Sequence, residues 1–345
     1  MLLLLAGPFA ATLLIGACGG SSSGDSMSVV RDSIGDTLIV RTVSGSEWGG
    51  AEGQLVPEVS VGVLDGPVEQ IFGSIRSLAV GANGTLYVMD GQVPAVRVFE
   101  ADGAYRTTLG RSGGGPGEFG SPDGGMAILS DGRLAVRDPG NARLQIFDAN
   151  GEASQTWPVV AGGFHTSSPM KRTAGDTLWT PVLMDREVDV SDWQMGLQRV
   201  APDGAVTDTV AIPEAGYETP RIEARVETDG GANVSMNAVP FSPDEASTLH
   251  PDGWFIHGIS DRYAFTLLRP GGYIRIERDA TPTSVTAGEK AEAEAEATRN
   301  MRSTDPNWRW NGPGIPDVKP AYDEIYTAMD GRIWVLVELE AVEQD

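Results

Sequence analysis

The chain has 345 residues, of which 41% are hydrophobic, 44 are glycine and 22 are proline. This composition fits a globular, turn-rich protein with a core and excludes an intrinsically disordered chain. Its 25 Lys and Arg residues stand against 48 Asp and Glu, which gives a formal net charge of −23. Because such a surface repels phosphate backbones, we expect no nucleic-acid partner, and the acidic excess serves solubility first.

The first residues have the character of an export signal. Residues 2–15 form an apolar run that is too short, and too interrupted at Gly7 and Pro8, to span a membrane. The run is typical of the hydrophobic region of a signal peptide, although no Lys or Arg precedes it. We therefore expect the mature protein to fold outside the cytoplasm.

The signal ends in a lipidation motif. Residues 15–18, Ile-Gly-Ala-Cys, resemble the bacterial lipobox, and the resemblance implies that Cys18 is lipidated and becomes the new N-terminus. We predict a signal peptide over 1–17 and a lipidated cysteine with a flexible Gly- and Ser-rich tether over 18–33. The expected location is the cell envelope, on its periplasmic or extracellular side, with the lipid as the only membrane contact. Glycine in place of aspartate after Cys18 favours the outer membrane.

The rest of the chain repeats one pattern, a tight turn followed at once by an apolar strand. It occurs at 35–40, 83–88, 131–136, 175–180, 252–257 and 330–335. Three pairs of glycines in successive turns are each 19 residues apart: 84 and 103, 132 and 151, 253 and 272. Two hairpins at a fixed separation indicate a repeat of four strands, and radial repetition of such a unit gives a β-propeller.

We predict an all-β, six-bladed β-propeller over residues 34–345. The first unit lacks an innermost strand and the last lacks its outer hairpin, so strands from the two ends are expected to share the closing blade. Near 286–303 a short helical insertion is predicted, because Thr286 and Glu289 form a capping box ahead of residues with high helix propensity.

One stretch resembles a known repeat family. Residues 138–147, Asp-Pro-Gly-Asn-Ala-Arg-Leu-Gln-Ile-Phe, look like the core of NHL repeats, and the glycine-rich residues 110–119 resemble a loop of bacterial six-bladed, NHL-like propeller lipoproteins. The detailed match covers residues 59–151. It implies the propeller fold and leaves function open, since propellers of this family include RNA-binding modules, protein-binding modules and enzymes.

The long insertions all lie on one side of the predicted repeat. The turns inside each hairpin are short, whereas the connections over 111–122, 158–169, 213–240 and 280–320 and the loop over 181–195 are long. In an up-and-down blade these five segments emerge on the same rim. Long loops on a rigid scaffold carry function in many proteins, so we interpret this rim as the ligand face, with neutral tolerance of insertions as the alternative.

Candidate residues for that face are acidic, aromatic or part of the family motif. They are Arg111, Glu118, Asp138, Asn141, Asp189, Trp193, Trp308 and Trp310. Aromatic side chains beside carboxylates suit the capture of a peptide or glycan, and they equally suit packing of the loops. For the four motif residues and Arg143, a structural role is the first interpretation and recognition the second.

No catalytic constellation is evident. His165, His250 and His257 fall in different units without metal-ligand spacing, and no catalytic residue is assigned. No cofactor is required, and a Ca²⁺ site near the propeller axis is compatible with the many Asp and Asn residues, although no spacing selects its ligands.

The sequence thus predicts a monomeric, membrane-anchored propeller that binds an envelope protein, a peptide or a glycan through its loop-rich face. The alternative is an extracytoplasmic metal-dependent hydrolase or lyase with Ca²⁺ or Zn²⁺ at the axis. A third reading is an architectural component of the envelope.

Overall fold

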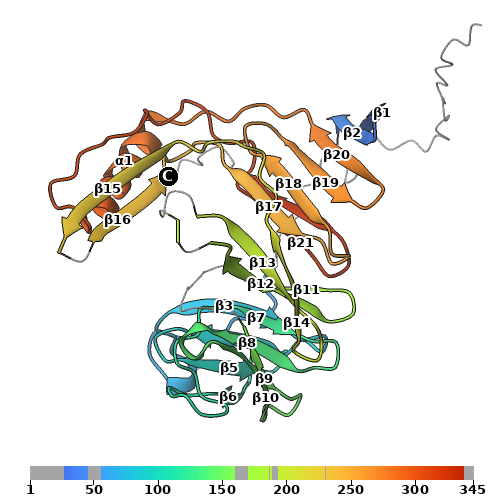
Figure 1. Cartoon of the computed structure of the whole chain (residues 1–345), viewed down its shortest axis with the longest axis vertical. Helices are drawn as coiled ribbons and strands as arrows, with labels where there is room; N and C mark the ends of the chain where they lie inside the picture. Colours follow the sequence, from blue (N-terminus) through green and yellow to red (C-terminus); the bar gives the residue numbers. More distant parts are fainter. Residues whose placement is uncertain are drawn as a thin grey trace, which may run out of the picture.

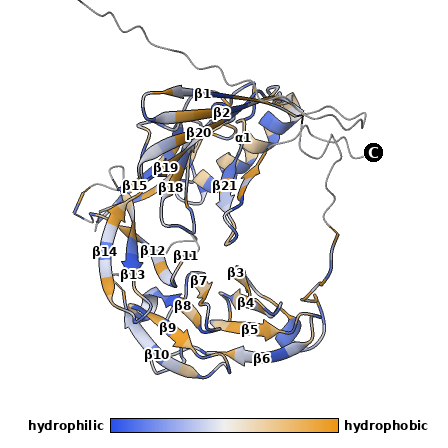
Figure 2. Ribbon diagram, turned by 90° about the vertical axis from the view of Figure 1, so that its right-hand side faces the viewer, coloured by the Kyte–Doolittle hydropathy of each residue, from blue (hydrophilic) through white to orange (hydrophobic). Residues whose placement is uncertain are grey.

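The computed structural model describes residues 27–45, 56–159, 170–185, 187–188, 193–229 and 231–337. Within these ranges the chain forms six sheets, one α-helix and two short 3-10 helices, Val68–Gln70 and Pro139–Asn141. The all-β propeller prediction is confirmed, because four of the sheets contain a four-stranded antiparallel meander and are set around a common centre (Figures 1 and 2). Cys18 and the predicted signal peptide lie outside the described residues.

Three sheets are four-stranded meanders of the predicted kind. The first contains β3 (Ile75–Val80), β4 (Leu86–Asp90), β5 (Ala95–Phe99) and β6 (Tyr105–Leu109). The second contains β7 (Met126–Ile128), β8 (Leu134–Asp138), β9 (Arg143–Phe147) and β10 (Ala153–Pro158). The third contains β11 (Lys171–Thr173), β12 (Thr177–Leu183), β13 (Met195–Val200) and β14 (Val206–Ala211). The turn glycines permit the tight connections: Gly84 and Gly132 have φ of 83° and 85°, a region that other residues rarely adopt.

The fourth sheet shows that the two chain ends do not share one blade as expected. It contains β17 (Glu245–Leu249), β18 (Phe255–Ile259), β19 (Ala264–Arg269) and β20 (Gly272–Arg278), and the N-terminal hairpin β1 (Ser28–Ile34) and β2 (Thr37–Ser44) extends it. Strand β2 pairs in parallel with β20, with Val40 opposite Ile276. The C-terminal strands β21 (Glu324–Thr327) and β22 (Ile333–Leu336) form a separate hairpin sheet. The open edge of β20 is thus covered by the first hairpin. This hairpin begins at Ser28, so the sheet structure starts before residue 34, the predicted start of the propeller.

A small module lies beside the ring (Figure 1). The hairpin β15 (Arg221–Thr228) and β16 (Gly231–Ala238) lies within the connection over 213–240 and packs on α1 (Ala287–Arg302). Helix α1 confirms the predicted insertion and its capping box, since the Thr286 side chain accepts from the Glu289 backbone while the Glu289 side chain accepts from the Thr286 N–H. Two connections far apart in sequence therefore build one shared core.

Apolar clusters hold successive sheets together. Phe147 and Val96 meet between the first two sheets, and Leu144 and Leu178 meet between the second and third. Another cluster joins the third sheet to β17 and β18, and a further one joins the β17–β20 sheet to β21. The short strands β3, β7, β11, β17 and β21 lie innermost, so the space that they enclose is the natural place for a site.

Candidate functional site

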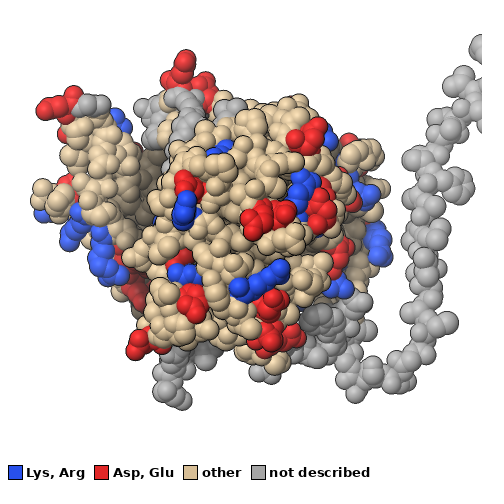
Figure 3. All heavy atoms as spheres, turned by 90° about the horizontal axis from the view of Figure 1, so that it is seen from below, with Lys and Arg blue, Asp and Glu red and all other residues tan. Residues whose placement is uncertain are grey.

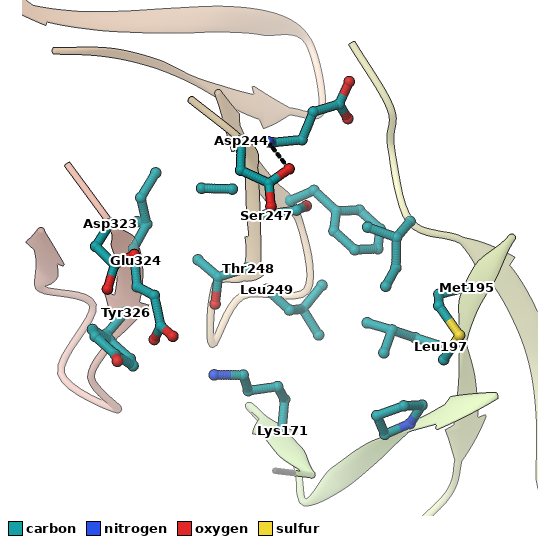
Figure 4. Close-up of a pocket in the computed structure, with 16 residues that line it drawn as sticks. Lys171, Met195, Leu197, Asp244, Ser247, Thr248, Leu249, Asp323, Glu324 and Tyr326 are labelled. Atoms are coloured by element: carbon teal, nitrogen blue, oxygen red, sulfur yellow. Dashed lines mark hydrogen bonds between the residues drawn. The ribbon is translucent and has the colours of Figure 1, made fainter. Parts of the chain in front are cut away.

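A cavity of about 600 Å³ lies between the β11–β14 sheet, the β17–β20 sheet and β21. It is lined by Lys171, Pro181, Met195, Leu197, Ile212, Asp244, Glu245, Ala246, Ser247, Thr248, Leu249, Phe255, Asp323, Glu324, Ile325 and Tyr326 (Figure 4). This volume falls within the usual range for small-molecule or peptide side-chain sites, roughly 300–1,000 Å³. Three innermost strands contribute to it, so it lies near the centre of the propeller.

One wall of the cavity is apolar. Met195 and Leu197 on β13 and Pro181 on β12 face Leu249 and Phe255 from the neighbouring sheet. Leu197 and Leu249 are 7% and 3% exposed and belong to the cluster that joins the two sheets. The wall is therefore fixed by packing and available as a rigid surface for an apolar group.

The opposite wall is acidic and lies at the ends of β17 and β21 that follow two of the long connections. Asp244 and Asp323 immediately precede β17 and β21, and Glu245 and Glu324 are the first residues of these strands. Because the long connections enter the strands at these ends, the carboxylates lie where the insertions meet the cavity. Among the described residues that line the cavity Lys171 is the only basic one, so the site carries a surplus of negative charge.

Two of these carboxylates also hold the insertion that precedes β17. Glu245 accepts hydrogen bonds from the backbone N–H groups of Ala215 at 3.0 Å and Tyr217 at 2.7 Å, and Asp244 accepts one from the Thr219 hydroxyl. The segment around 215–219 is thereby tied to the mouth of the cavity, so this loop and the mouth form one surface.

Polar groups from three strands meet beside the acidic wall (Figure 4). Figure 4 shows the Lys171 amine, the Thr248 hydroxyl and the Glu324 carboxylate pointing into the same part of the space. Burial lowers the pKa of Lys171, and the charge of Glu324 opposes that shift. Hydrogen bonding to Glu324 raises the pKa of the Tyr326 phenol. Thr248 is 6% exposed, and its hydroxyl has no hydrogen-bond partner among the described residues.

The Asp138 and Asn141 side chains form a structural network away from this cavity. The fully buried Asp138 carboxylate accepts from the backbone N–H groups of Gly120 at 3.0 Å and Ser121 at 2.9 Å, and from Nδ2 of Asn141 at 2.6 Å. Asn141 Nδ2 also donates to the carbonyl of Gly113 at 3.0 Å. Both side chains are thus committed to fixing the glycine-rich loop, which is the first interpretation made from the sequence.

The same loop is closed by an ion pair. Arg111 and Glu118 lie 2.8 Å apart, and the backbone N–H of Gly115 donates to Glu118 at 2.8 Å. The Gly115 hydrogen bond, followed by the Arg111 interaction, holds the pKa of Glu118 below its ordinary value. Arg143 donates to the Gly115 and Glu118 carbonyls at 2.7 and 2.8 Å. The Arg111 side chain is 80% exposed, so of these residues it is the most open to a partner.

The tryptophans have different environments. Trp308 is 4% exposed, donates from Nε1 to the Glu223 carbonyl at 2.7 Å, and packs in the core under α1. Trp310 lies edge-on to it with ring centroids 6.2 Å apart. These two residues therefore join the inserted module, and Trp308 presents no free indole face for stacking. Trp193 is 42% exposed near the start of β13, while Asp189 lies outside the described residues.

The histidines do not meet at the axis in the part of the chain that the structure describes. His250 stacks on Trp254, with ring centroids 3.9 Å apart, and lies near the Gly331 carbonyl. His257 is on β18, its two ring nitrogens lack partners among the described residues, and burial lowers its pKa. His165 lies outside those residues. Within the described ranges, no group of three or more His, Cys, Asp or Glu could hold a metal ion.

The sequence did not indicate the cavity residues. Lys171, Thr248 and Glu324 belong to three separate units and share no motif or spacing. The feature that these three residues share is their position in the topology, since each lies on an innermost strand. The distribution of surface charge does not mark the position of the site either, because acidic and basic side chains are intermixed on the face drawn in Figure 3.

No helix in the described residues is both long and apolar enough to cross a bilayer.

Fold and cavity together define a β-propeller with an acidic, partly apolar site near its centre. No family model matches the chain, and no curated protein matches it. Solved structures are similar at low identity. A putative exported protein from Bacteroides fragilis shares 12% identity over 77% of this chain, with a TM-score of 0.41. The chain spans 66% of the length of that protein, which is just under two thirds. Virginiamycin B lyase from Staphylococcus aureus shares 11% identity over 76% of this chain and 90% of its own length, with a TM-score of 0.31.

Proposed function

We propose that this protein is an extracytoplasmic binding module that takes an apolar, positively charged peptide segment into the cavity beside β11, β17 and β21. The observation that carries the proposal is the pairing of a fixed apolar wall with a surplus of carboxylates in one space of about 600 Å³. The apolar wall would bury a side chain of the ligand, and the carboxylates at the mouth would attract the cationic residues beside it.

The lining favours a peptide over a glycan. Sugars are held in many sites by stacking on aromatic rings, and here the apolar wall is built mainly from aliphatic side chains such as Met195, Leu197 and Leu249. The two tryptophans that the sequence singled out for stacking, Trp308 and Trp310, pack in the module around α1. An aliphatic wall of this kind complements an aliphatic or aromatic side chain, whose burial contributes roughly 1.5–3 kcal/mol.

A set of short labelled peptides tests the proposal by fluorescence anisotropy at physiological ionic strength. One alternates Leu and Lys, a second Ser and Lys, and a third Leu and Glu. We expect the Leu-Lys peptide to bind at least about tenfold more tightly than either of the others, a difference of about 1.4 kcal/mol. The Ser-Lys peptide controls for plain attraction to a chain with net charge −23. Equal binding of all three would overturn the proposal.

Filling the cavity supplies the matched variants. Met195→Trp places a large side chain in the apolar wall, whereas Val206→Trp places the same side chain on the outer strand β14, where Val206 is 42% exposed. Met195→Trp should weaken binding of the Leu-Lys peptide by about tenfold, and Val206→Trp should leave it unchanged. If both variants bind like the unaltered protein, the ligand does not use this cavity.

The proposal includes export and anchoring by a lipid on Cys18, with the outer membrane as the favoured location. The support is the apolar N-terminal run and the lipobox-like residues 15–18. Cell fractionation of a Cys18→Ala variant, with metabolic labelling by a palmitate analogue, tests it. The variant should lose both the label and the membrane association, and an unchanged membrane fraction would contradict the anchor.

A further inference from the structure

One end of the cavity holds one donor, one acceptor and one hydroxyl from three different strands, with Glu324 exposed, Lys171 half-buried and Thr248 buried. Lys171 on β11 supplies an ammonium group, Glu324 on β21 a carboxylate, and Thr248 on β17 a hydroxyl that can donate or accept (Figure 4). No ion pair joins Lys171 to Glu324 in the described residues, and the Glu324 carboxylate, which also accepts from the Tyr326 hydroxyl, keeps lone pairs for a ligand.

Opposite charges at this end select against a charged ligand group. A carboxylate placed beside Lys171 would also lie beside Glu324, and an ammonium placed beside Glu324 would also lie beside Lys171. Because Lys171 is half-buried, water only partly screens its repulsion of a ligand ammonium, while the exposed Glu324 disfavours a ligand carboxylate less strongly. An amide avoids this cost, since its C=O accepts from Lys171 while its N–H donates to Glu324.

The Thr248 hydroxyl is an independent sign of a ligand at this point. A buried hydroxyl without a partner is unfavourable, and native structures rarely leave one unexplained. Thr248 is more than nine-tenths buried and is drawn pointing into the cavity (Figure 4). A ligand carbonyl that accepts from Lys171 can accept from this hydroxyl too, through its second lone pair.

We propose that the Lys171, Thr248 and Glu324 cluster reads an uncharged amide of the bound peptide. The ligand is therefore an internal segment or an amidated end, and a free chain terminus is rejected at this position. This inference rests on the proposed function, because it specifies the polar group that accompanies the apolar side chain.

One basic peptide ending in leucine, prepared as a carboxamide and as a free carboxylate, tests the inference. The carboxamide should bind the unaltered protein at least about tenfold more tightly than the carboxylate. Glu324→Gln leaves Lys171 as the only charge of the cluster, so the preference should reverse toward the carboxylate. Asp131→Asn, which removes an exposed charge outside the cavity, should leave the preference for the carboxamide in place.

Thr248→Val provides a second measurement that changes no charge. It should weaken carboxamide binding by about fivefold, as expected for one hydrogen bond. Thr85→Val is the matched control, because the buried Thr85 hydroxyl also lacks a partner among the described residues but immediately precedes β4, away from the cavity. Urea unfolding confirms that each variant is folded before affinity is compared.

The outcomes separate the two proposals. Equal binding of carboxamide and carboxylate, with no reversal in Glu324→Gln, overturns the amide assignment while the peptide-binding function stands. Failure of the unaltered protein to bind either form or the Leu-Lys peptide overturns both. Loss of affinity in Thr85→Val as large as that in Thr248→Val removes Thr248 from the site.

Discussion

Replacing Asp138 with alanine tests whether the network around this residue is structural. The Asp138 carboxylate is fully buried and accepts from two backbone N–H groups and from Asn141, with Nε of Arg143 at 3.6 Å. Without the carboxylate these buried donors lose their acceptor, and the Arg143 charge loses its nearest counter-charge. Removing one partner of such a buried charged network costs roughly 3–5 kcal/mol.

That loss is large against the free energy of unfolding of a typical protein, roughly 5–15 kcal/mol. Urea unfolding followed by tryptophan fluorescence measures it from the shift in midpoint at constant slope. Asp131→Ala is the control, because Asp131 pairs with Arg133 at 2.7 Å but is 52% exposed. An exposed pair contributes less than about 1 kcal/mol. If the Asp138 and Asp131 variants lose equal stability, the network does not hold the glycine-rich loop as argued.

Three further predictions concern the inserted module. Trp308→Ala should lower the free energy of unfolding by roughly 3–5 kcal/mol, measured by urea unfolding. Trp193→Ala should lower it by less than about 1 kcal/mol. The opposite order would contradict the packing role of Trp308. Thr286→Ala should cost about 1 kcal/mol through loss of the helix cap, read as a lower thermal midpoint, and an unchanged midpoint would speak against the capping box. Lys319 and then Thr286 hold the pKa of Glu289 at about 2, below its ordinary 4.5, so its stabilising contribution is complete above about pH 4.5 and is lost as the pH falls toward 2. In acid unfolding followed by circular dichroism, Glu289→Gln should lose less stability than the unaltered protein over that range, and parallel curves would refute this.

Local signals predicted the blades well. A turn followed by an alternating apolar strand has a physical cause within a few residues, so β4, β8 and β12 begin within the repeats predicted at 83–88, 131–136 and 175–180. The capping box at Thr286 likewise predicted where α1 begins. Such features depend on neighbours in sequence, and a single chain displays them directly.

Pairings between distant segments were not predictable in the same way. The parallel pairing of β2 with β20 joins residues more than two hundred positions apart, and no local pattern specifies which open edge the first hairpin covers. The hairpin β15–β16 was interpreted as part of a long connection because it lies outside the repeat. Its apolar residues Ile222 and Ala224 face α1, which comes from another connection, so their partner was not evident.

The same contrast holds for the functional residues: some lie close together in the sequence, and others are brought together only by the fold. Motif residues such as Asp138 can be recognised from the sequence because they lie close together within one unit. The same closeness lets them hold a single loop in place. Lys171, Thr248 and Glu324 become neighbours only when three innermost strands converge, and each is unremarkable in its own unit. A propeller can therefore keep its repeat pattern for folding while it changes single residues on the inner strands for recognition. Polar residues on those strands, rather than the aromatic residues of the long loops, are the positions at which substitutions should alter ligand preference without unfolding the blades.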